Sequence, residues 1–482
     1  MNDPRALDRV AVMACVAVAC VAVAPAALSP LWDADVWWIL RAGMDMLREG
    51  HVPHQNRYSF TAPDAPWVMH EWGFGVVYAL LARGGVAWLA LPRIAAVVLT
   101  AWAATWRSMR DARPVVAAAC VAVTLVVFGG RFESPRPVGI TYALACALAA
   151  VCFDAGFSAR HAALTTAMML VWANAHGSFP LGLLMLALGL ASPGGDRRAR
   201  VASIVCGLAV TAVNPYGLAL HGLALRYALG LGGDSVAVVH ARILEWWPLW
   251  RAPWRVASGP QLVAALAMAL VALASLKDPR WRARGALTLA LSWMALRHGR
   301  HLGLAGITCA PLLAGPIESM IARGAWRPRS VSRSALLACV VVPAALGGAL
   351  WGLASRSRAA GDWVDASRQD EAARALLEAM PEGARAFVEL PFTGFAVLVG
   401  APRVSVFFDA RNDCYPAEVL RAALDVNDGL LAPPEALRVR ARGATHALVR
   451  CASRAARSLS GAERVAVRDG VCLYHVGPPG GR

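Results

Sequence analysis

The chain is poor in charge and has almost no lysine. Of its 482 residues, 16% are charged and 58% are hydrophobic, and Lys277 is the only lysine. Mean hydropathy is +0.50. A soluble domain of this composition would expose large apolar patches, so the composition argues against an ordinary soluble enzyme. The basic residues lie in short loops rather than on one compact face, which argues against nucleic-acid binding.

The sequence also lacks a Cys-x-x-Cys pair, so the cysteines do not indicate a zinc site. Eight of the 11 cysteines lie in apolar runs, where they behave as small hydrophobic residues. Cys414, Cys451 and Cys472 lie in the C-terminal part of the chain. One disulfide among these three is expected if that part lies outside the cytoplasm.

Long apolar runs dominate what is present. A helix needs about 20 apolar residues to cross a bilayer, and this criterion predicts an α-helical polytopic membrane protein with about 11 spans. The first run is interpreted as a span and not as a cleaved signal peptide, since no soluble protein follows it. The spans are expected near residues 10–31, 86–106, 114–129, 138–153, 161–175, 178–192, 200–213, 259–276, 285–297, 302–320 and 334–354.

The net charge of +16 indicates an orientation. Basic loops at 107–113, 194–200, 277–284 and 323–333 are assigned to the cytoplasm together with the N-terminus, because cytoplasmic loops carry the excess of arginine and lysine. We therefore expect a transmembrane domain over residues 1–358 with a large outer loop at 32–85, and a small extracytoplasmic α/β domain over residues 359–482. The unusual polar clusters then all fall on the outer side, which indicates a site facing the periplasm or cell exterior.

The tail differs in kind from the rest of the chain. Strands are predicted for RAFVEL, FAVLVG, RVSVFF, THALVR, ERVAVR and VCLYHV, and helices for PAEVLRAALDV and PPEALRVRARG. The dipeptide Asp469-Gly470 predicts a hairpin between the last two strands. Asp409 and Arg411 follow a strand, at the usual ligand side of an α/β sheet, although a salt-bridged turn would explain them equally.

Asp33 and Asp35 directly follow the first apolar run. Carboxylates beside a membrane are costly unless they are paired or bound to a metal. Two of them can share a divalent cation, or one can act as a base. The alternative is solvation at a helix end with Arg41 as ion-pair partner. Arg41 is otherwise a candidate for substrate binding. Trp37 and Trp38 would stack on a sugar or belong to the interfacial aromatic belt.

Further polar clusters lie in the other outer segments. His70 and Glu71 could supply a second acid–base or metal group, or pair within an interfacial loop. Arginines in the outer segments are contrary to the positive-inside trend and therefore need an anionic partner. A lipid-linked phosphate or a nearby carboxylate would provide it. Asn174, His176 and Asn214 would bind substrate or cap helix ends. The arginine-bearing segments contribute Arg131, Glu133, Arg136, Arg297, Arg300 and His301.

The stretch DADVWWILRAGMDMLREGHVP, with PWVMHEW after it, resembles the first-loop signature of a large bacterial group of multi-span proteins. These proteins are grouped with the GT-C glycosyltransferases, which use lipid-linked sugars. WANAHGSFPLG, NPYGLALHG, RHLGLAGITCAP and VFFDARNDCY also match that group. The resemblance implies a first-loop acidic residue, Asp33 or Asp35, as base or metal ligand. It also implies interfacial helices near 40–50 and 70–83, and phosphate-binding arginines. Ile39 departs from the group, where a histidine is expected.

The sequence therefore predicts an inverting GT-C-like glycosyltransferase of the bacterial inner membrane. It would transfer a sugar from a polyprenyl-phosphate donor to an extracytoplasmic glycan, lipid or protein, with Asp33, Asp35 and Glu71 as catalytic candidates. A divalent cation could be required. The alternatives are a transporter of lipid-linked glycans, which needs polar residues near the middle of the membrane, and a non-catalytic assembly protein for envelope polysaccharide.

Overall fold

The computed structural model describes residues 4–31, 33–231, 233–251, 253–321, 332–358, 369–430 and 442–476. The chain is mostly helical and has one small sheet near its C-terminus. It divides into two compact units. The first contains residues 1–29, 88–221 and 243–357, and the second contains residues 30–87, 222–242 and 358–482. Each unit is described by itself.

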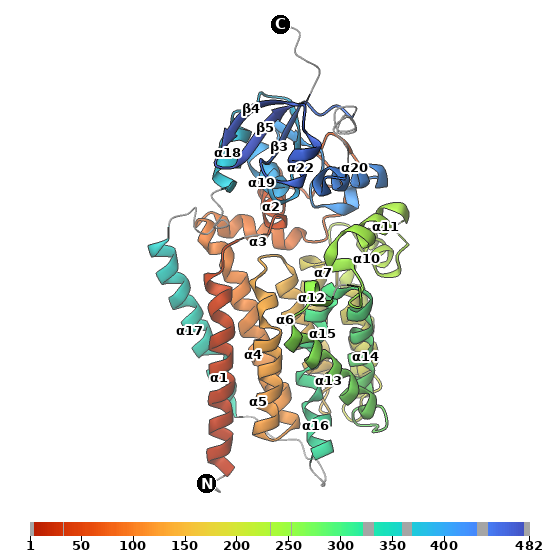
Figure 1. Ribbon diagram of the computed structural model, residues 1–482. Coiled ribbons are helices and arrows are strands. Elements are labelled where there is room, and N and C mark those ends of the chain that lie inside the picture. Colours follow the sequence, from red (N-terminus) through yellow and green to blue (C-terminus); the bar gives the residue numbers. More distant parts are fainter. Residues whose placement is uncertain are drawn as a thin grey trace. The chain divides into compact units, whose positions relative to one another are not determined.

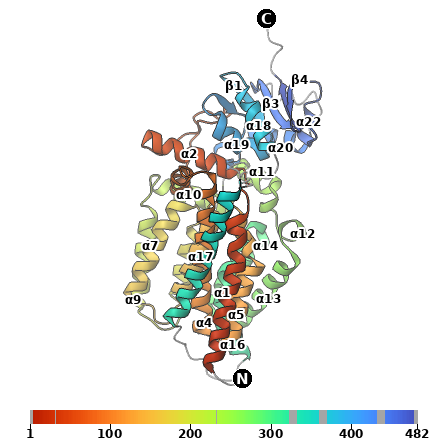
Figure 2. The same ribbon diagram turned by 90° about the vertical axis from the view of Figure 1, so that its left-hand side faces the viewer.

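The first unit is a bundle whose long helices run side by side (Figures 1 and 2). Short 3-10 or π segments interrupt it at η2 (Val123–Val127), η3 (Gly129–Glu133), η4 (Leu244–Trp246), η5 (Gly299–His301) and η6 (Pro311–Leu313). Its helices are α1 (Pro4–Leu28), α4 (Leu91–Asp111), α5 (Pro114–Ala122), α6 (Val138–Cys152), α7 (Ala159–Ala175), α8 (Pro180–Gly189), α9 (Arg197–Thr211), α12 (Pro253–Val256), α13 (Gly259–Ser275), α14 (Arg282–Arg297), α15 (Leu302–Cys309), α16 (Ala314–Ile321) and α17 (Arg333–Ser357).

The prediction of about 11 spans is wrong by the criterion of helix length. Among the described residues, three helices are long and apolar enough to cross a membrane: Asp8–Leu28, Val86–Asp111 and Arg333–Ser357. The pair Gly299–Cys309 and Pro311–Ile321, bent by 43°, raises this number to four if it forms one span. Most other expected spans are helices of 10–17 residues. At about 1.5 Å per residue, these fall short of a hydrocarbon core of about 30 Å.

Three arginines of the predicted inner loops, Arg107, Arg200 and Arg284, are buried in this unit rather than solvated. Arg284 Nη1 lies 2.5 Å from Asp111, which also pairs with Arg107. Arg200 donates to the carbonyl oxygens of Cys152, Gly189 and Asp154 at 2.6–2.9 Å. These contacts join α4, α6, α9 and α14 at one end of the bundle. Arginines that the sequence analysis used to assign the cytoplasmic side therefore also connect the helices to one another.

The second unit joins the first loop to the C-terminal residues. It contains α2 (Asp35–Glu49), α3 (Trp72–Ala82), α11 (Gly233–Arg242), α18 (Gln369–Glu378), α19 (Leu390–Gly400), α20 (Ala417–Asp428) and α22 (Arg454–Ser458). Its strands are β1 (Ala384–Val388), β2 (Val404–Val406), β3 (His446–Arg450), β4 (Glu463–Arg468) and β5 (Val471–His475), in the order β2-β1-β3-β5-β4. The sequence had assigned the segment 32–85 to the transmembrane domain.

Most elements predicted for the tail are confirmed. β1 pairs in parallel with β2 and β3, whereas β5 is antiparallel to β3 and β4. Asp469 and Gly470 have φ of 44° and 82°, as a tight hairpin requires. The prediction of a strand at FAVLVG is wrong, since this segment belongs to helix α19. A short apolar run in a sequence does not distinguish a buried strand from a buried helix. The helix predicted at PPEALRVRARG lies almost wholly outside the described residues.

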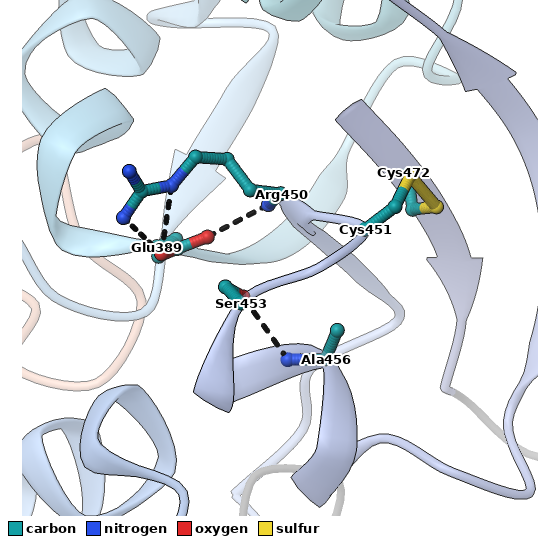
Figure 3. Close-up of a disulfide and its surroundings, with 6 residues drawn as sticks. All are labelled: Glu389, Arg450, Cys451, Ser453, Ala456 and Cys472. Carbon is teal, nitrogen blue, oxygen red and sulfur yellow. Dashed lines mark hydrogen bonds and ion pairs between the residues drawn. A yellow bond between two sulfur atoms is a disulfide. The ribbon is translucent and has the colours of Figure 1, made fainter. Parts of the chain in front are cut away.

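The expected disulfide joins Cys451 to Cys472, with Cα atoms 5.1 Å apart, and links the end of β3 to β5 (Figure 3). Cys414 is a buried free thiol. Beside the disulfide, Arg450 donates to the buried Glu389 carboxylate at 2.7 Å (Figure 3). The bond therefore closes the ladder between two adjacent strands.

Close helix contacts hold the first loop within the second unit. A Cβ at Gly43 of α2 would collide with the carbonyl oxygen of Gly75 in α3, and a Cβ at Gly394 of α19 would collide with that of Ala34. Glycine is needed at both positions because the backbones approach so closely. Helices were expected near 40–50 and 70–83, and α2 and α3 confirm them.

Candidate functional site

Three segments of the first unit meet around one carboxylate. Arg136 Nη2 lies 3.2 Å from Glu245 Oε2, and Arg300 Nη1 lies 3.3 Å from Glu245 Oε1. Arg136 follows η3, Glu245 lies in η4 and Arg300 lies in η5. All three side chains keep 27–31% of their surface exposed. We call Arg136, Glu245 and Arg300 the arginine–glutamate cluster.

Aromatic contacts and hydrogen bonds fix the cluster from one side. The Arg300 guanidinium lies over the Trp246 ring, 4.3 Å from its centre. His298 Nδ1 is 2.7 Å from the Trp246 carbonyl oxygen, and the His301 ring packs edge-on against the Trp246 ring. The residues around Trp246 are thereby attached to the end of α14, and the Arg300 side chain is oriented.

The charge of the cluster is unbalanced. Burial by itself would raise the pKa of Glu245, but Arg300 and Arg136 lower it from 4.5 to about 2. One permanently ionised carboxylate therefore faces two guanidiniums, and the excess is positive. Such a forked, cationic arrangement suits the oxygens of a phosphate group.

The other predicted arginines lie apart from this pairing. Arg131 donates to the carbonyl oxygen of Val256 at 2.7 Å, which joins η3 to α12. The backbone carbonyl of Glu133 accepts a hydrogen bond from Arg93 at 2.9 Å. Arg297 is an exposed residue at the end of α14. The structure thus brings together Arg136, Arg300 and His301 among the predicted residues of these segments.

Asn174, His176 and Asn214 act at helix ends. The Asn174 side chain donates to the carbonyl oxygens of Leu170 and Val213, at 2.8 and 3.0 Å. His176 Nδ1 lies 2.8 Å from Ser178 Oγ. Asn214 accepts from the Tyr216 backbone at 2.8 Å and donates back to the Thr211 carbonyl oxygen. These contacts favour the structural alternative, helix capping and turn formation, for both asparagines.

In the second unit, Asp35 is the first residue of α2 and Asp33 lies just before its N-cap, Ala34. Asp33 Oδ1 accepts the backbone N–H of Asp35 at 3.0 Å, and Asp35 Oδ1 accepts the indole N–H of Trp38 at 3.2 Å. Asp33 is 8% exposed, whereas Asp35 is half-buried. These hydrogen bonds orient both carboxylates, as a base or a cation ligand requires.

Trp37 and Trp38 belong to the core of this unit, which corrects the expectation that they stack on a sugar. They are 3% and 5% exposed. Trp37 packs edge-on against Phe395 and Trp38 against Trp67, with ring centres 5.8 and 6.1 Å apart. The apolar faces that would contact a sugar contact protein instead.

Arg41 likewise has a structural role rather than binding substrate. Its guanidinium pairs with Asp45 at 3.0 Å and donates to the carbonyl oxygens of Leu398 and Ala401. Tyr58 also donates to Asp45, at 2.8 Å. The pair therefore ties α2 to α19 and to the rest of the first loop.

His70 and Glu71 remain close neighbours in the structure. His70 Nε2 lies 3.6 Å from the Glu71 carboxylate, and Glu71 is 8% exposed. Burial raises the pKa of Asp413, whereas His70 opposes the rise. His70 therefore lies near carboxylates of both the first loop and the C-terminal part of the chain.

Asp409 and Arg411 form a fully buried ion pair, with the Arg411 Nη2 atom 2.7 Å from the Asp409 carboxylate. Arg411 Nη2 also donates to Asn56 Oδ1 at 2.7 Å, and its guanidinium lies over the rings of Tyr58 and Trp67. The pair therefore attaches the first loop to the sheet. This supports the salt-bridged turn, not substrate contact, as its role.

Sequence reasoning missed several of the residues that organise these sites. Glu245 was not among the predicted site residues, although the unexplained outer arginines indicated that they had an acidic partner. Asp45 could have been found from its i,i+4 spacing to Arg41. Asn56 and Trp246 carry no local signal, because their partners are distant in sequence.

No family model matches the sequence, and no curated protein matches it. Solved structures, in contrast, match the chain. The chain is similar in fold to an archaeal oligosaccharyltransferase, a GT-C-type enzyme. The apo form of the Archaeoglobus fulgidus enzyme matches with a TM-score of 0.56 and 11% identity, over 91% of this chain and 69% of that one.

Two further structures of that archaeal protein match similarly. Archaeal oligosaccharyltransferase AglB in complex with an inhibitory peptide and a dolichol-phosphate has a TM-score of 0.57, 11% identity and the same coverages. The complex with Zn and sulfate has a TM-score of 0.52 and 11% identity, over 90% of this chain and 67% of that one. At this identity the likeness establishes the fold, which agrees with the GT-C-like prediction.

Proposed function

We propose that this chain is a membrane glycosyltransferase that transfers a sugar from a polyprenyl-phosphate donor to an extracytoplasmic glycan, lipid or protein. The observation that carries the proposal is the fold similarity to an oligosaccharyltransferase over 91% of the chain. The matching structure with a dolichol-phosphate and a peptide supports a lipid-linked donor and an acceptor.

The proposed reaction is a single displacement at the anomeric carbon. Asp35 or Asp33 accepts the proton of the acceptor hydroxyl, whose oxygen forms the new bond to the sugar. The bond from the sugar to the donor phosphate breaks, and the phosphate leaves with the electron pair. Arg136 and Arg300 stabilise the charge that develops on this phosphate. A single displacement inverts the anomeric configuration.

The proposed divalent cation would be held by Asp33 and Asp35. Carboxylate oxygens oriented at a helix N-terminus fit a hard divalent ion, and such an ion would lower the pKa of an acceptor hydroxyl. The match to a structure with Zn and sulfate supports a cation in this fold. The protein residues themselves position the carboxylates, through the Asp35 backbone and the Trp38 indole.

We further propose that the chain is a multi-pass protein of the bacterial inner membrane, with its N-terminus in the cytoplasm and its tail outside. The Cys451–Cys472 disulfide supports this placement of the tail, because structural disulfides persist in oxidising compartments. The three long apolar helices support membrane insertion.

The test is donor turnover by the purified full chain in nanodiscs. We expect sugar release from at least one polyprenyl-phosphate donor, reduced about 10²–10⁴-fold by Asp35→Asn or Asp33→Asn, as for loss of a general base. Asp64→Asn, a matched change at an exposed position of the same loop, should retain turnover. EDTA sensitivity would separate a metal ligand from a base. Full activity of the Asp33→Asn, Asp35→Asn double variant would contradict the proposal.

The arginine–glutamate cluster is tested in the same assay. Arg136→Gln and Arg300→Gln should each lower turnover about 10²–10³-fold, since each removes a charge that is proposed to stabilise the developing anion. Arg226→Gln, a change of the same type in the last turn of α10 (Leu218–Leu229), should have little effect. Equal turnover in all three variants would place phosphate binding elsewhere.

A further inference from the structure

Two histidines and a glutamate form a row across three strands of the C-terminal sheet. His446 of β3 is directly opposite His475 of β5, and His475 is directly opposite Glu463 of β4. Residues directly opposite one another project from the same face of a sheet. Figure 1 shows the three strands side by side. The row lies where β3 begins and β5 ends.

The two imidazoles are close enough to share a ligand. Their ring centres are 5.4 Å apart, at an interplanar angle of 82°. The neighbouring pair is hydrogen-bonded, because the Val476 N–H donates to the Thr445 carbonyl oxygen at 2.9 Å. His446 and His475 are therefore a non-hydrogen-bonded pair, in which opposing side chains lie closest.

Thr445 provides a second contact that suits a metal ligand. Its Oγ1 lies 2.8 Å from His446 Nδ1 and can accept the Nδ1 proton. This bond would fix the tautomer in which Nε2 carries the lone pair. Metal-binding histidines commonly direct their other ring nitrogen to such an oxygen.

The exposure of the three side chains also suits a coordination site. Both histidines are half-buried and Glu463 is exposed on the edge strand, so an ion can enter from solvent.

We propose that His446, His475 and Glu463 form a binding site for a divalent transition metal of the zinc type. Two imidazoles and one carboxylate are a normal ligand set for this ion, with water in the remaining position. Tetrahedral coordination with bonds of about 2.1 Å places ligand atoms about 3.4 Å apart. Binding of an ion would require the two rings and the exposed Glu463 side chain to turn toward one another.

The site would complete the cross-linking of the sheet. The Cys451–Cys472 disulfide joins β3 and β5 at the opposite end of the same ladder, where Cys472 is opposite Val449. A metal on the three-residue row would join β3 and β5 at the near end and include β4, which is an edge strand. The ion would thus have a structural role in the second unit, separate from the proposed transfer chemistry.

The experiment uses the full chain in detergent and Zn²⁺ as the probe. The wild type should bind one more equivalent of Zn²⁺ in calorimetry than the His446→Gln, His475→Gln double variant. A His51→Gln, His54→Gln variant, which removes two exposed histidines of the same unit, should match the wild type. Co²⁺ should give the absorption of a tetrahedral site in the wild type and lose it in the His446→Gln, His475→Gln variant.

A single variant guards against loss of folding in the double variant. Glu463→Gln changes an exposed position and should weaken Zn²⁺ binding about tenfold or more, in line with the loss of one ligand. Equal Zn²⁺ stoichiometry in the wild type and the histidine double variant would overturn the proposal, as would Zn²⁺ binding that is unaffected by Glu463→Gln.

Discussion

Replacing Arg411 with methionine tests whether the buried ion pair holds the first loop to the sheet. Both side chains of the Asp409–Arg411 pair are fully buried. Although burial alone would lower the pKa of Arg411, Asp409 raises it well above its ordinary value, so the guanidinium stays charged. Arg411→Met would leave the Asp409 carboxylate buried without its partner.

The expected loss is large because several contacts disappear together. Removing one member of a buried pair costs about 3–5 kcal/mol. The stacking on Tyr58 and Trp67, at 4.8 and 4.4 Å, adds about 0.5–2 kcal/mol. At about 2–4 °C per kcal/mol for a unit of this size, the second unit should melt on the order of 10 °C lower.

The assay is the temperature at which Cys414, a buried free thiol of the second unit, becomes accessible to alkylation, measured by peptide mass spectrometry. Arg374→Met breaks an exposed pair with Glu378, where the side chains are 60% and 55% exposed, and should change stability by less than about 0.5 kcal/mol. If Arg411→Met melts at the temperature of Arg374→Met, the reasoning about this pair is refuted. The Asp409→Asn, Arg411→Met double variant should recover part of the loss.

The remaining predictions concern stability. Gly43→Ala should destabilise the contact between α2 and α3 by about 1–3 kcal/mol in the Cys414 assay, whereas Gly222→Ala, which has open space, should be nearly neutral. Glu245 stabilises the fold above pH 4.5, because its pKa is lower in the folded chain, and this contribution is lost as the pH falls from 4.5 to about 2. The Glu245→Gln variant should therefore be less stable than the wild type by about 1–2 kcal/mol at pH 7, after allowance for the partial exposure of Glu245. The difference between the two proteins in thermal unfolding should vanish near pH 2. A difference that stays constant with pH would contradict this reasoning. Cys451→Ser with Cys472→Ser should cost about 3 kcal/mol, given 21 residues of separation, and reductant should have the same effect on the wild type but none on the variant.

Local chemistry explains which predictions from the sequence succeeded. The hairpin at Asp469-Gly470 was predictable because two successive residues with positive φ favour this dipeptide. β3 and β5 were predictable from short β-rich runs bounded by turn residues. The pairing of Cys451 with Cys472 could not be chosen among three cysteines, since it depends on the register of β3 and β5.

The candidate sites show the limits of the same reasoning. Asp33 and Asp35 stood out because two carboxylates beside an apolar run are costly. Glu245 did not stand out, although it receives both Arg136 and Arg300, because 109 residues separate it from Arg136. Trp37 and Trp38 were misinterpreted, since indoles near a membrane, in a sugar site and in a core look the same in sequence.

The sequence by itself determined the class of protein, because apolar composition and run length depend on no tertiary contact. It also determined which segments carry the unusual polar residues. The tertiary structure decided helix length, the grouping of the first loop with the tail, and the separation of buried ion pairs such as Asp409–Arg411 from accessible ones such as Arg136–Glu245. The physical reason is that burial and charge pairing arise from contacts between residues far apart in the chain, and neither composition nor local spacing records those contacts.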